Sequence, residues 1–112
     1  MKKIEAIIRP EKFEEVQKAI EQVGYTGLMV TDIQGHGAQK GIMQQWRGDE
    51  YRVSLISKMK LEIVCKDSAA QRLVDAITAA GRTGEVGDGK IFVSTIDQAV
   101  RIRSGETGEK AL

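Results

Sequence analysis

The sequence predicts an α+β fold in which two strand-helix-strand units share one antiparallel sheet. Apolar residues alternate along two extended segments, residues 2–9 and 59–65. Each segment is followed by a stretch whose apolar residues recur at intervals of three and four, and then by another extended segment. Two such units, with both helices on one face of the sheet, form the ferredoxin-like double βαβ sandwich.

The first unit covers residues 2–33. Its first strand ends at Pro10, which is well placed at the start of a helix. Residues 11–23 are predicted to form an amphipathic helix that ends at Gly24. The apolar stripe of this helix is Phe13, Val16, Ala19, Ile20 and Val23. Residues 27–33 are rich in β-branched side chains and are predicted to form the second strand.

The second unit begins with the strand over residues 59–65, which has the clearest period of two in the chain. Asp67 or Ser68 is expected to cap the next helix, which ends at Gly81. The stripe of this helix is Ala70, Leu73, Val74, Ile77 and Ala80. A glycine-rich turn then leads to a strand over residues 90–96.

Apolar residues are expected on both faces of the sheet. If Ile4, Ile8, Met59 and Ile63 face the helices, then Ile7, Ile33 and Val64 lie on the opposite face. An apolar sheet face needs a cover, so we expect a second chain to pack on it in an oligomer.

Composition limits the classes of function. A chain of 112 residues is long enough for one domain and too short for two, so we expect a single domain over residues 1–112. Its 17 basic and 16 acidic residues leave a formal charge of +1, which disfavours a dedicated nucleic-acid surface or polybasic membrane surface. Charged residues come too early for a signal peptide, and no apolar run approaches a membrane span. We expect a cytoplasmic protein without membrane insertion.

The single cysteine and single histidine exclude several kinds of site. Cys65 alone cannot form a disulfide framework or a cysteine cluster within the chain, and we expect it to be a small core residue. His36 alone cannot build a multi-histidine metal site, and a solvated loop position is its simplest interpretation.

The stretch from Gly35 to Lys58 is predicted to be a long loop without a convincing period. It contains Trp46, Tyr51 and several glycines, and loops of this length in a compact domain commonly bind something. Two interpretations remain open: a binding loop, or a hairpin arm that only packs in an oligomer.

The glycine-rich segment 81–90 is a candidate phosphate site. Glycines allow backbone N–H groups to turn toward an anion, and Lys90 supplies charge. The alternative is an ordinary tight turn at Asp88-Gly89.

Two arginines near the C-terminus strengthen the phosphate interpretation. Residues 100–103 are predicted to be extended, which would place Arg101 and Arg103 on one side, about 6.6–7 Å apart, while Val100 and Ile102 pack. Two parallel guanidinium groups suit a polyphosphate, although solvated surface charges are the alternative. With Arg82, Lys90 and Lys58, five cations would lie near strand ends or turns.

Several motifs in these segments are specific. They are Gln39-Lys40-Gly41, Trp46-Arg47-Gly48-x-Glu50-Tyr51, Lys58-x-Lys60-x-Glu62, Arg82-Thr83-Gly84-x-x-Gly87-Asp88-Gly89-Lys90-Ile91-Phe92-Val93 and Arg101-Ile102-Arg103-x-Gly105-Glu106. With them, the chain resembles the PII nitrogen-regulatory signal proteins in register from Met1 to Leu112.

The resemblance implies a homotrimer of ferredoxin-like subunits that has no active site. ATP or ADP would bind in each cleft between subunits, and Mg-ATP would recruit 2-oxoglutarate. A long hairpin, the T-loop, would cover about residues 37–55, the B-loop about 82–90 and the C-terminal loop about 101–112. T-loop conformation would control an ammonium transporter, glutamine-synthetase-related enzymes or regulators.

The resemblance also implies site residues by position. Nucleotide contacts would fall on Gly35, Gly37, Ala38, Val64, Gly87, Asp88, Gly89, Lys90, Arg101 and Arg103. Contacts to 2-oxoglutarate would fall on Gln39, Lys40, Gly41, Lys58 and Gly87, and Gln39 would also bind Mg²⁺. Tyr51 matches a uridylylated or adenylylated tyrosine, and Trp46, Arg47 and Tyr51 would face partners.

The chain departs from the family pattern at several positions. Ala38 replaces the usual arginine at a phosphate contact, and Met29 stands where threonine is common. Ser54 and Ser57 replace the usual aspartate and proline, and Asp49 replaces the phosphorylatable serine of one branch.

Three other functions are alternatives to this one. A PII-like protein could sense a different small anion or adenine nucleotide for another metabolic partner. An acylphosphatase would need an arginine, for which Arg9 is available, and a catalytic asparagine, but the chain contains no Asn. An RNA-binding sheet needs displayed aromatic residues, and only Phe92 lies in a predicted strand.

Overall fold

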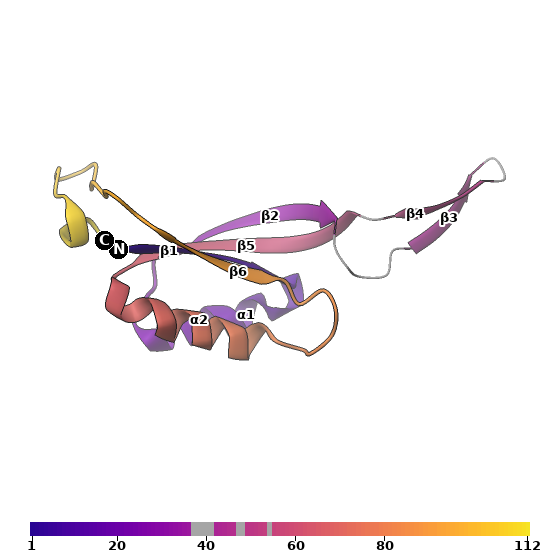
Figure 1. Ribbon diagram of the computed structural model, residues 1–112, viewed down its shortest axis with the longest axis horizontal. Helices are drawn as coiled ribbons and strands as arrows, with labels where there is room; N and C mark the ends of the chain where they lie inside the picture. The colour runs from indigo at the N-terminus through magenta and orange to yellow at the C-terminus, as the bar shows by residue number, and fades with distance from the viewer. Residues whose placement is uncertain (37–41, 47–48, 54) are drawn as a thin grey trace.

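A computed structural model describes residues 1–36, 42–46, 49–53 and 55–112, and the side chains of 1–36 and 55–112 (Figure 1). Its strands are β1 (Lys2–Ile8), β2 (Met29–His36), β3 (Ile42–Trp46), β4 (Asp49–Val53), β5 (Leu55–Cys65) and β6 (Lys90–Thr95). Its helices are α1 (Phe13–Val23) and α2 (Asp67–Gly81), with short 3₁₀ turns at Pro10–Lys12 and Gly108–Ala111.

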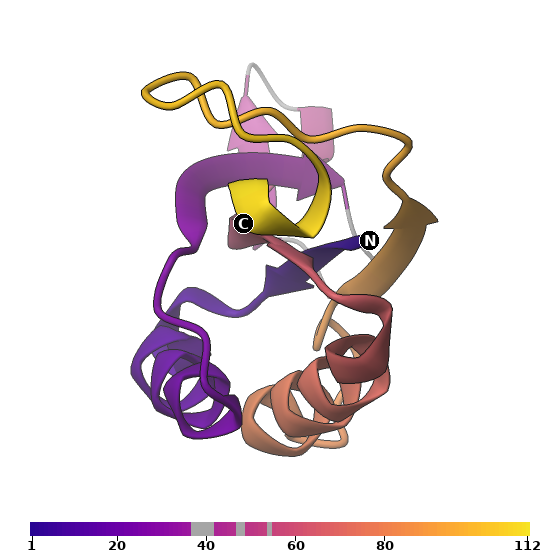
Figure 2. The same ribbon diagram turned by 90° about the vertical axis from the view of Figure 1, so that its left-hand side faces the viewer.

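The main sheet has four strands in the order β2-β5-β1-β6, and every neighbouring pair is antiparallel. Both helices cover the same face of this sheet (Figures 1 and 2). This arrangement confirms the predicted ferredoxin-like α+β fold. Its other face is not covered by either helix, and we call it the helix-free face.

The core lies between the sheet and the two helices. Alternate residues of β1 and β5 point toward the helices, and each helix contributes the residues of one stripe. The buried apolar residues are Ile4, Ala6, Ile8, Val16, Ile20, Leu61, Ile63, Cys65, Ala69, Leu73 and Ile77. Cys65 is therefore a core residue, as predicted.

The helix ends differ from the expectation in one respect. α1 ends at Gly24 as predicted, where φ is +109° and the glycine N–H donates to the carbonyl groups of Ile20 and Glu21. At the start of α2, however, neither Asp67 nor Ser68 caps the helix through its side chain. The carboxylate of Asp67 instead pairs with the N-terminal amine of Met1 at 2.9 Å. The predicted cap was wrong because α2 already begins at Asp67, so that Lys66 occupies the cap position, and because the terminal amine engages the Asp67 carboxylate.

The ends of the Gly35–Lys58 stretch are strands rather than loop. Gly35 and His36 lie in β2, and their partners in β5 are Ile56 and Leu55. The predicted strand ended at residue 33, three residues too early. The backbone hydrogen bonds between β2 and β5 continue to His36, and such bonds form without an alternating pattern of apolar side chains. Between these ends, β3 and β4 pair as an antiparallel two-stranded sheet beyond the end of the main sheet (Figure 1).

The C-terminal segment is a turn rather than an extended strand. Val100 forms a single bridge to Thr107, and the carbonyl group of Arg101 accepts from the N–H of Gly105 at 2.7 Å. Ile102 is 98% exposed in the single chain, so the prediction that it packs within that chain was wrong. Gly105 adopts φ +74°, which allows the chain to reverse direction after Arg103. The two-residue spacing of Arg101 and Arg103 does not reveal this turn.

The helix-free face combines half-buried apolar residues with paired charges. Ile7, Ile33 and Val64 lie on it, as the pairing register requires. Lys3 contacts Glu5 at 3.1 Å and Glu62 at 2.9 Å.

Among the described residues, no helix is long and apolar enough to cross a membrane.

Candidate functional site

A cavity of about 560 Å³ opens on the helix-free face at the end of the sheet where β6 begins. It is lined by Ile7, Ile33, Gly35, His36, Ile56, Lys58, Glu85, Gly87, Asp88, Gly89, Lys90 and Phe92. Six of these are predicted site residues: Gly35, Lys58, Gly87, Asp88, Gly89 and Lys90. The fold thus brings two cations and a glycine-rich loop to one apolar hollow.

The loop over residues 82–89 contacts the backbone of β1 at Gly89. A Cβ atom on Gly89 would lie 1.7 Å from the carbonyl oxygen of Ile7, and the φ of Gly89 is +97°. Any side chain would collide with main-chain atoms that belong to a central strand. Glycine at this position is therefore required for packing, whatever the loop binds.

The carboxylate of Asp88 orders the same loop. It accepts hydrogen bonds from the N–H of Thr83 at 2.9 Å, the N–H of Gly84 at 2.8 Å and the hydroxyl of Thr83. The Nε of Arg9 also donates to it at 2.9 Å. The Thr83 hydroxyl, and next the Arg9 guanidinium, hold the pKa of Asp88 well below its usual range. This side chain is occupied by the loop, so only its backbone is available to a ligand.

Lys58 is a nearly buried cation with a neutral partner. Its side chain comes from β5, the residue is 9% exposed, and the ammonium group donates to the carbonyl oxygen of Gly87. Burial, and next the charge of Arg9, lower the pKa of Lys58. A buried charge of this kind is suited to an incoming anion, which would supply the opposite charge that the carbonyl lacks.

Val64 and the two C-terminal arginines lie at the other end of the sheet. Lys3 of β1 is opposite both Val64 and Ser94, whereas Ile7 is opposite Lys60 and Lys90. Val64 is therefore level with the end of β6, and Figure 1 shows the C-terminal segment beyond that end. Lys90 and the two C-terminal arginines are separated by the length of β6, so one chain does not bring them together.

The two C-terminal arginines differ in their surroundings. Arg101 donates through Nη2 to the carbonyl oxygen of Leu112 at 2.9 Å and lies 3.5 Å from a carboxylate oxygen of Glu106. Arg103 is exposed. The predicted parallel pair is not formed, because residues 102–104 turn.

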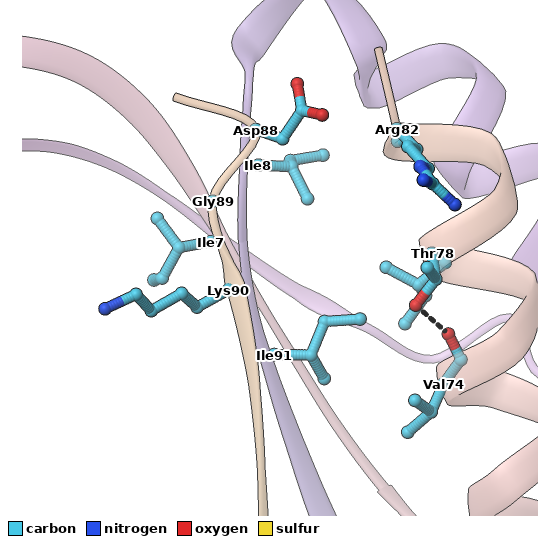
Figure 3. Close-up of a pocket in the computed structure, with 11 residues that line it drawn as sticks. Ile7, Ile8, Val74, Thr78, Arg82, Asp88, Gly89, Lys90 and Ile91 are labelled. Atoms are coloured by element: carbon cyan, nitrogen blue, oxygen red, sulfur yellow. Dashed lines mark hydrogen bonds between the residues drawn. The ribbon is translucent and has the colours of Figure 1, made fainter. Parts of the chain in front are cut away.

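A second, smaller cavity of about 250 Å³ lies on the helix side of the same loop, between α2 and the start of β6 (Figure 3). Arg82 lies along α2, whereas the side chain of Lys90 points to the opposite side of the sheet. Thr78 donates its hydroxyl to the carbonyl of Val74 at 2.7 Å. The predicted group of five cations is thus divided among three places.

Several predicted contacts lie outside the described residues or side chains. Gly37, Ala38, Gln39, Lys40, Gly41 and Arg47 are outside the described residues. Trp46 and Tyr51 belong to β3 and β4, of which only the backbone is described.

Sequence reasoning missed Arg9 as a member of this region. Its guanidinium also donates from Nη2 to the carbonyl of Val86 at 2.9 Å. The only sequence signal for this residue is an arginine directly after a predicted strand. That signal is weak, because the chain offers 16 acidic residues as possible partners. Ile33, Ile56 and Phe92 were missed as lining residues because strand pairing alone brings them to the cavity.

Comparison with known proteins agrees with this arrangement. The family model for nitrogen regulatory protein P-II matches residues 1–106. The chain is 50% identical over 112 residues to nitrogen regulatory protein P-II 2 of Methanothermobacter thermautotrophicus, covering 100% of this chain and 97% of that protein. It is 52% identical to nitrogen regulatory protein P-II of Bradyrhizobium diazoefficiens and 50% identical to that of Microchaete diplosiphon, each over 100% of both chains. The chain belongs to the P-II family of nitrogen regulatory proteins, signalling regulators that assemble as homotrimers and act on partner proteins.

Proposed function

We propose that this chain is a non-enzymatic, cytoplasmic signalling regulator that binds ATP or ADP and, with Mg-ATP, 2-oxoglutarate. Through the conformation of its T-loop it would control an ammonium transporter, a glutamine-synthetase-related enzyme or a regulator of nitrogen metabolism. The proposal includes a homotrimer with one nucleotide between each pair of subunits.

One observation carries the proposal: the two groups of cations lie at opposite ends of β6. A phosphate chain can contact Lys90 and the loop 82–89 of one subunit and Arg101 and Arg103 of a neighbour only if two chains form the site. Charge-assisted contacts from arginine suit polyphosphates, and the loop contributes backbone N–H groups. Val64 of the neighbour would then lie near the base.

The oxo-acid part of the proposal depends on Lys58. Its buried ammonium group is next to the carbonyl of Gly87, inside the cavity. A carboxylate of 2-oxoglutarate would bind there, with Gln39, Lys40, Gly41 and Gly87 as further contacts. Gln39 would offer a neutral oxygen to Mg²⁺.

The partner-facing part of the proposal concerns the hairpin. Trp46, Arg47 and Tyr51 would contact the regulated protein, and Tyr51 would accept a uridylyl or adenylyl group where a suitable transferase is present.

Calorimetry with ATP, ADP and 2-oxoglutarate tests the ligands. We expect 2-oxoglutarate to bind only when Mg-ATP is present, because the nucleotide and the metal complete its site. Tight binding of 2-oxoglutarate to the ligand-free protein would contradict this coupling. Binding of another anion, with no response to 2-oxoglutarate, would favour the alternative of a PII-like sensor for a different effector.

Mixed trimers test the shared site. Lys90→Ala and Arg103→Ala should each weaken ATP about 10- to 100-fold. In trimers assembled from equal amounts of both variants, about one site in four should recover the original affinity, because that interface has Lys90 from one subunit and Arg103 from its neighbour. Mixtures that recover no binding would contradict a site formed by two subunits.

Ala38 allows a further test, since the family usually has arginine there. Ala38→Arg should raise ATP affinity by at most about 1.5–3 kcal/mol, the range for a charged hydrogen bond. An unchanged or weaker affinity would show that the phosphates are held in another way.

A further inference from the structure

Arg9 directly follows β1, and its side chain is hydrogen-bonded to the loop 82–89. Its side chain is only 11% exposed. Nε donates to the carboxylate of Asp88 and Nη2 to the carbonyl oxygen of Val86, each at 2.9 Å. Asp88 in turn accepts from the N–H groups of Thr83 and Gly84. One guanidinium group therefore controls both halves of the loop.

The orientation of two peptide groups follows from these bonds. No peptide bond among the described residues is cis, so the N–H of each planar unit points opposite to its carbonyl group. The carbonyl of Val86 points to Arg9 and that of Gly87 points to Lys58. The N–H groups of Gly87 and Asp88 must then point away from these two cations. Neither N–H donates to an acceptor in the described part of the chain.

We propose that Arg9 is a positioning residue of the nucleotide site, which directs the N–H groups of Gly87 and Asp88 toward a bound phosphate without touching it. This role rests on the proposed function. Two parallel donors on a planar group reach the Asp88 carboxylate and the Val86 carbonyl together, and a lysine ammonium group has no such fork. The role therefore requires arginine rather than any cation.

Two other roles make different predictions. A direct phosphate contact would act independently of Asp88, yet both Nε and Nη2 are already occupied. A purely structural role would change the stability of the fold and leave the affinity of folded protein for nucleotide unchanged.

The first experiment measures ATP and ADP affinity by calorimetry for the full chain with Arg9→Met and Arg9→Lys. We expect Arg9→Met to weaken ATP about tenfold, at the lower end of the range for a charged hydrogen bond because the effect is indirect. Arg9→Lys should recover only part of this loss. Arg72→Met is the matched control, since it removes the same charge from an exposed position on α2. It should bind ATP normally.

A double-mutant cycle with Asp88→Asn separates positioning from direct contact. If Arg9 acts through Asp88, each single change weakens ATP about tenfold and the double variant is little weaker than either. A double variant about 100-fold weaker than the unmutated protein would overturn the proposal, because the two losses would then be independent.

Amide exchange reports the loop without ligand. In Arg9→Met the N–H groups of Thr83 and Gly84 should exchange several-fold faster than in Arg72→Met. A lower melting temperature with normal ATP affinity would assign Arg9 a structural role only. Absence of nucleotide binding by the unmutated protein would overturn the proposed function and this role together, whereas normal binding by Arg9→Met would overturn the role alone.

Discussion

The loop 82–89 and the C-terminal segment 97–112 carry similar residues and are held in different ways. Each has glycines at positive φ, and each contains or adjoins cations that we assign to the nucleotide site: Lys90 directly after the loop, and Arg101 and Arg103 within the C-terminal segment. The loop is supported by Arg9, by Lys58 and by the backbone of β1. The C-terminal segment is held largely by its own backbone bonds, such as that from Arg101 N–H to the carbonyl of Glu106 at 2.8 Å.

The loop 82–89 is therefore a preformed half of the proposed site, whereas the C-terminal segment is a half that needs contacts from a second subunit. The loop keeps its shape through contacts with Arg9, Lys58 and the backbone of β1, so a ligand does not have to order it. In the C-terminal segment Ile102 is 98% exposed, which a single chain does not explain. We expect a second subunit to cover this surface and complete the site.

The largest expected effect compares two glycines at positive φ, one in each region. Gly89→Ala should destabilise the protein by about 3 kcal/mol, because the new Cβ atom would collide with the carbonyl of Ile7. Gly105→Ala should lose only about 1 kcal/mol, since φ is +74° but no atom lies within 4 Å of the new Cβ. Urea unfolding at one protein concentration measures both. Equal losses would show that the β1 backbone does not constrain the loop.

The next effect tests the role of the C-terminal segment. Arg103→Ala should weaken ATP about 10- to 100-fold, the worth of a charged hydrogen bond, and leave unfolding within about 0.5 kcal/mol. Lys110→Ala, a charge-matched change in the same segment, should do neither. Calorimetry and urea unfolding provide the two measurements. A loss of affinity smaller than twofold would remove Arg103 from the site.

A third prediction concerns Lys58, which supports the loop from β5. Lys58→Met should stabilise the ligand-free protein by about 1 kcal/mol, because a buried charge with only a carbonyl partner is removed, and should abolish 2-oxoglutarate binding. Lys60→Met is the control, as its ammonium lies 3.6 Å from Glu62 on the same strand. Stability should be measured by urea unfolding. A loss above about 1 kcal/mol in Lys58→Met would mean that the contact with Gly87 outweighs burial.

The pH dependence of Lys58 provides a second measurement of the same effect. Its pKa is lowered in the fold, so the unfolded chain binds that proton more tightly. The free energy of unfolding should therefore rise with pH in the alkaline range up to the ordinary lysine value of 10.5. This rise should be absent from Lys58→Met.

The smallest expected effect is the loss of the stability contribution of Asp88 at acidic pH. The pKa of Asp88 is lowered in the fold, so its contribution is complete above the ordinary value of 3.8 and is lost as pH falls through the folded value. The stability difference between the unmutated protein and Asp88→Asn should stay constant from neutral pH to about pH 4 and shrink below it. Asp97→Asn, at an exposed position after β6, is the control for loss of a carboxylate. Shrinkage that begins well above pH 4 would contradict the Arg9–Asp88 arrangement.

Much of the fold could be predicted because its helices and strands follow from the spacing of apolar residues along short segments. The alternation in residues 59–65 and the stripe of Phe13, Val16 and Ile20 each indicate one buried face. Residues 100–103 were predicted wrongly because two arginines two apart are compatible with a strand or a turn. The backbone of Gly105 decides between them. The loop glycines and Lys90 were found by composition, since they are adjacent in sequence.

By itself the sequence determined the elements, the helix-covered core and the chemical character of the loop, because spacing along a chain sets which residues share a face. The tertiary structure decided which distant residues meet. Arg9 contacts Asp88 across 79 positions, and Lys58 contacts Gly87 across 29. It also separated Lys90 from the C-terminal arginines by the length of β6. Such contacts depend on strand order and register, which local residue patterns do not encode, because pairing is chosen by the packing of the whole sheet.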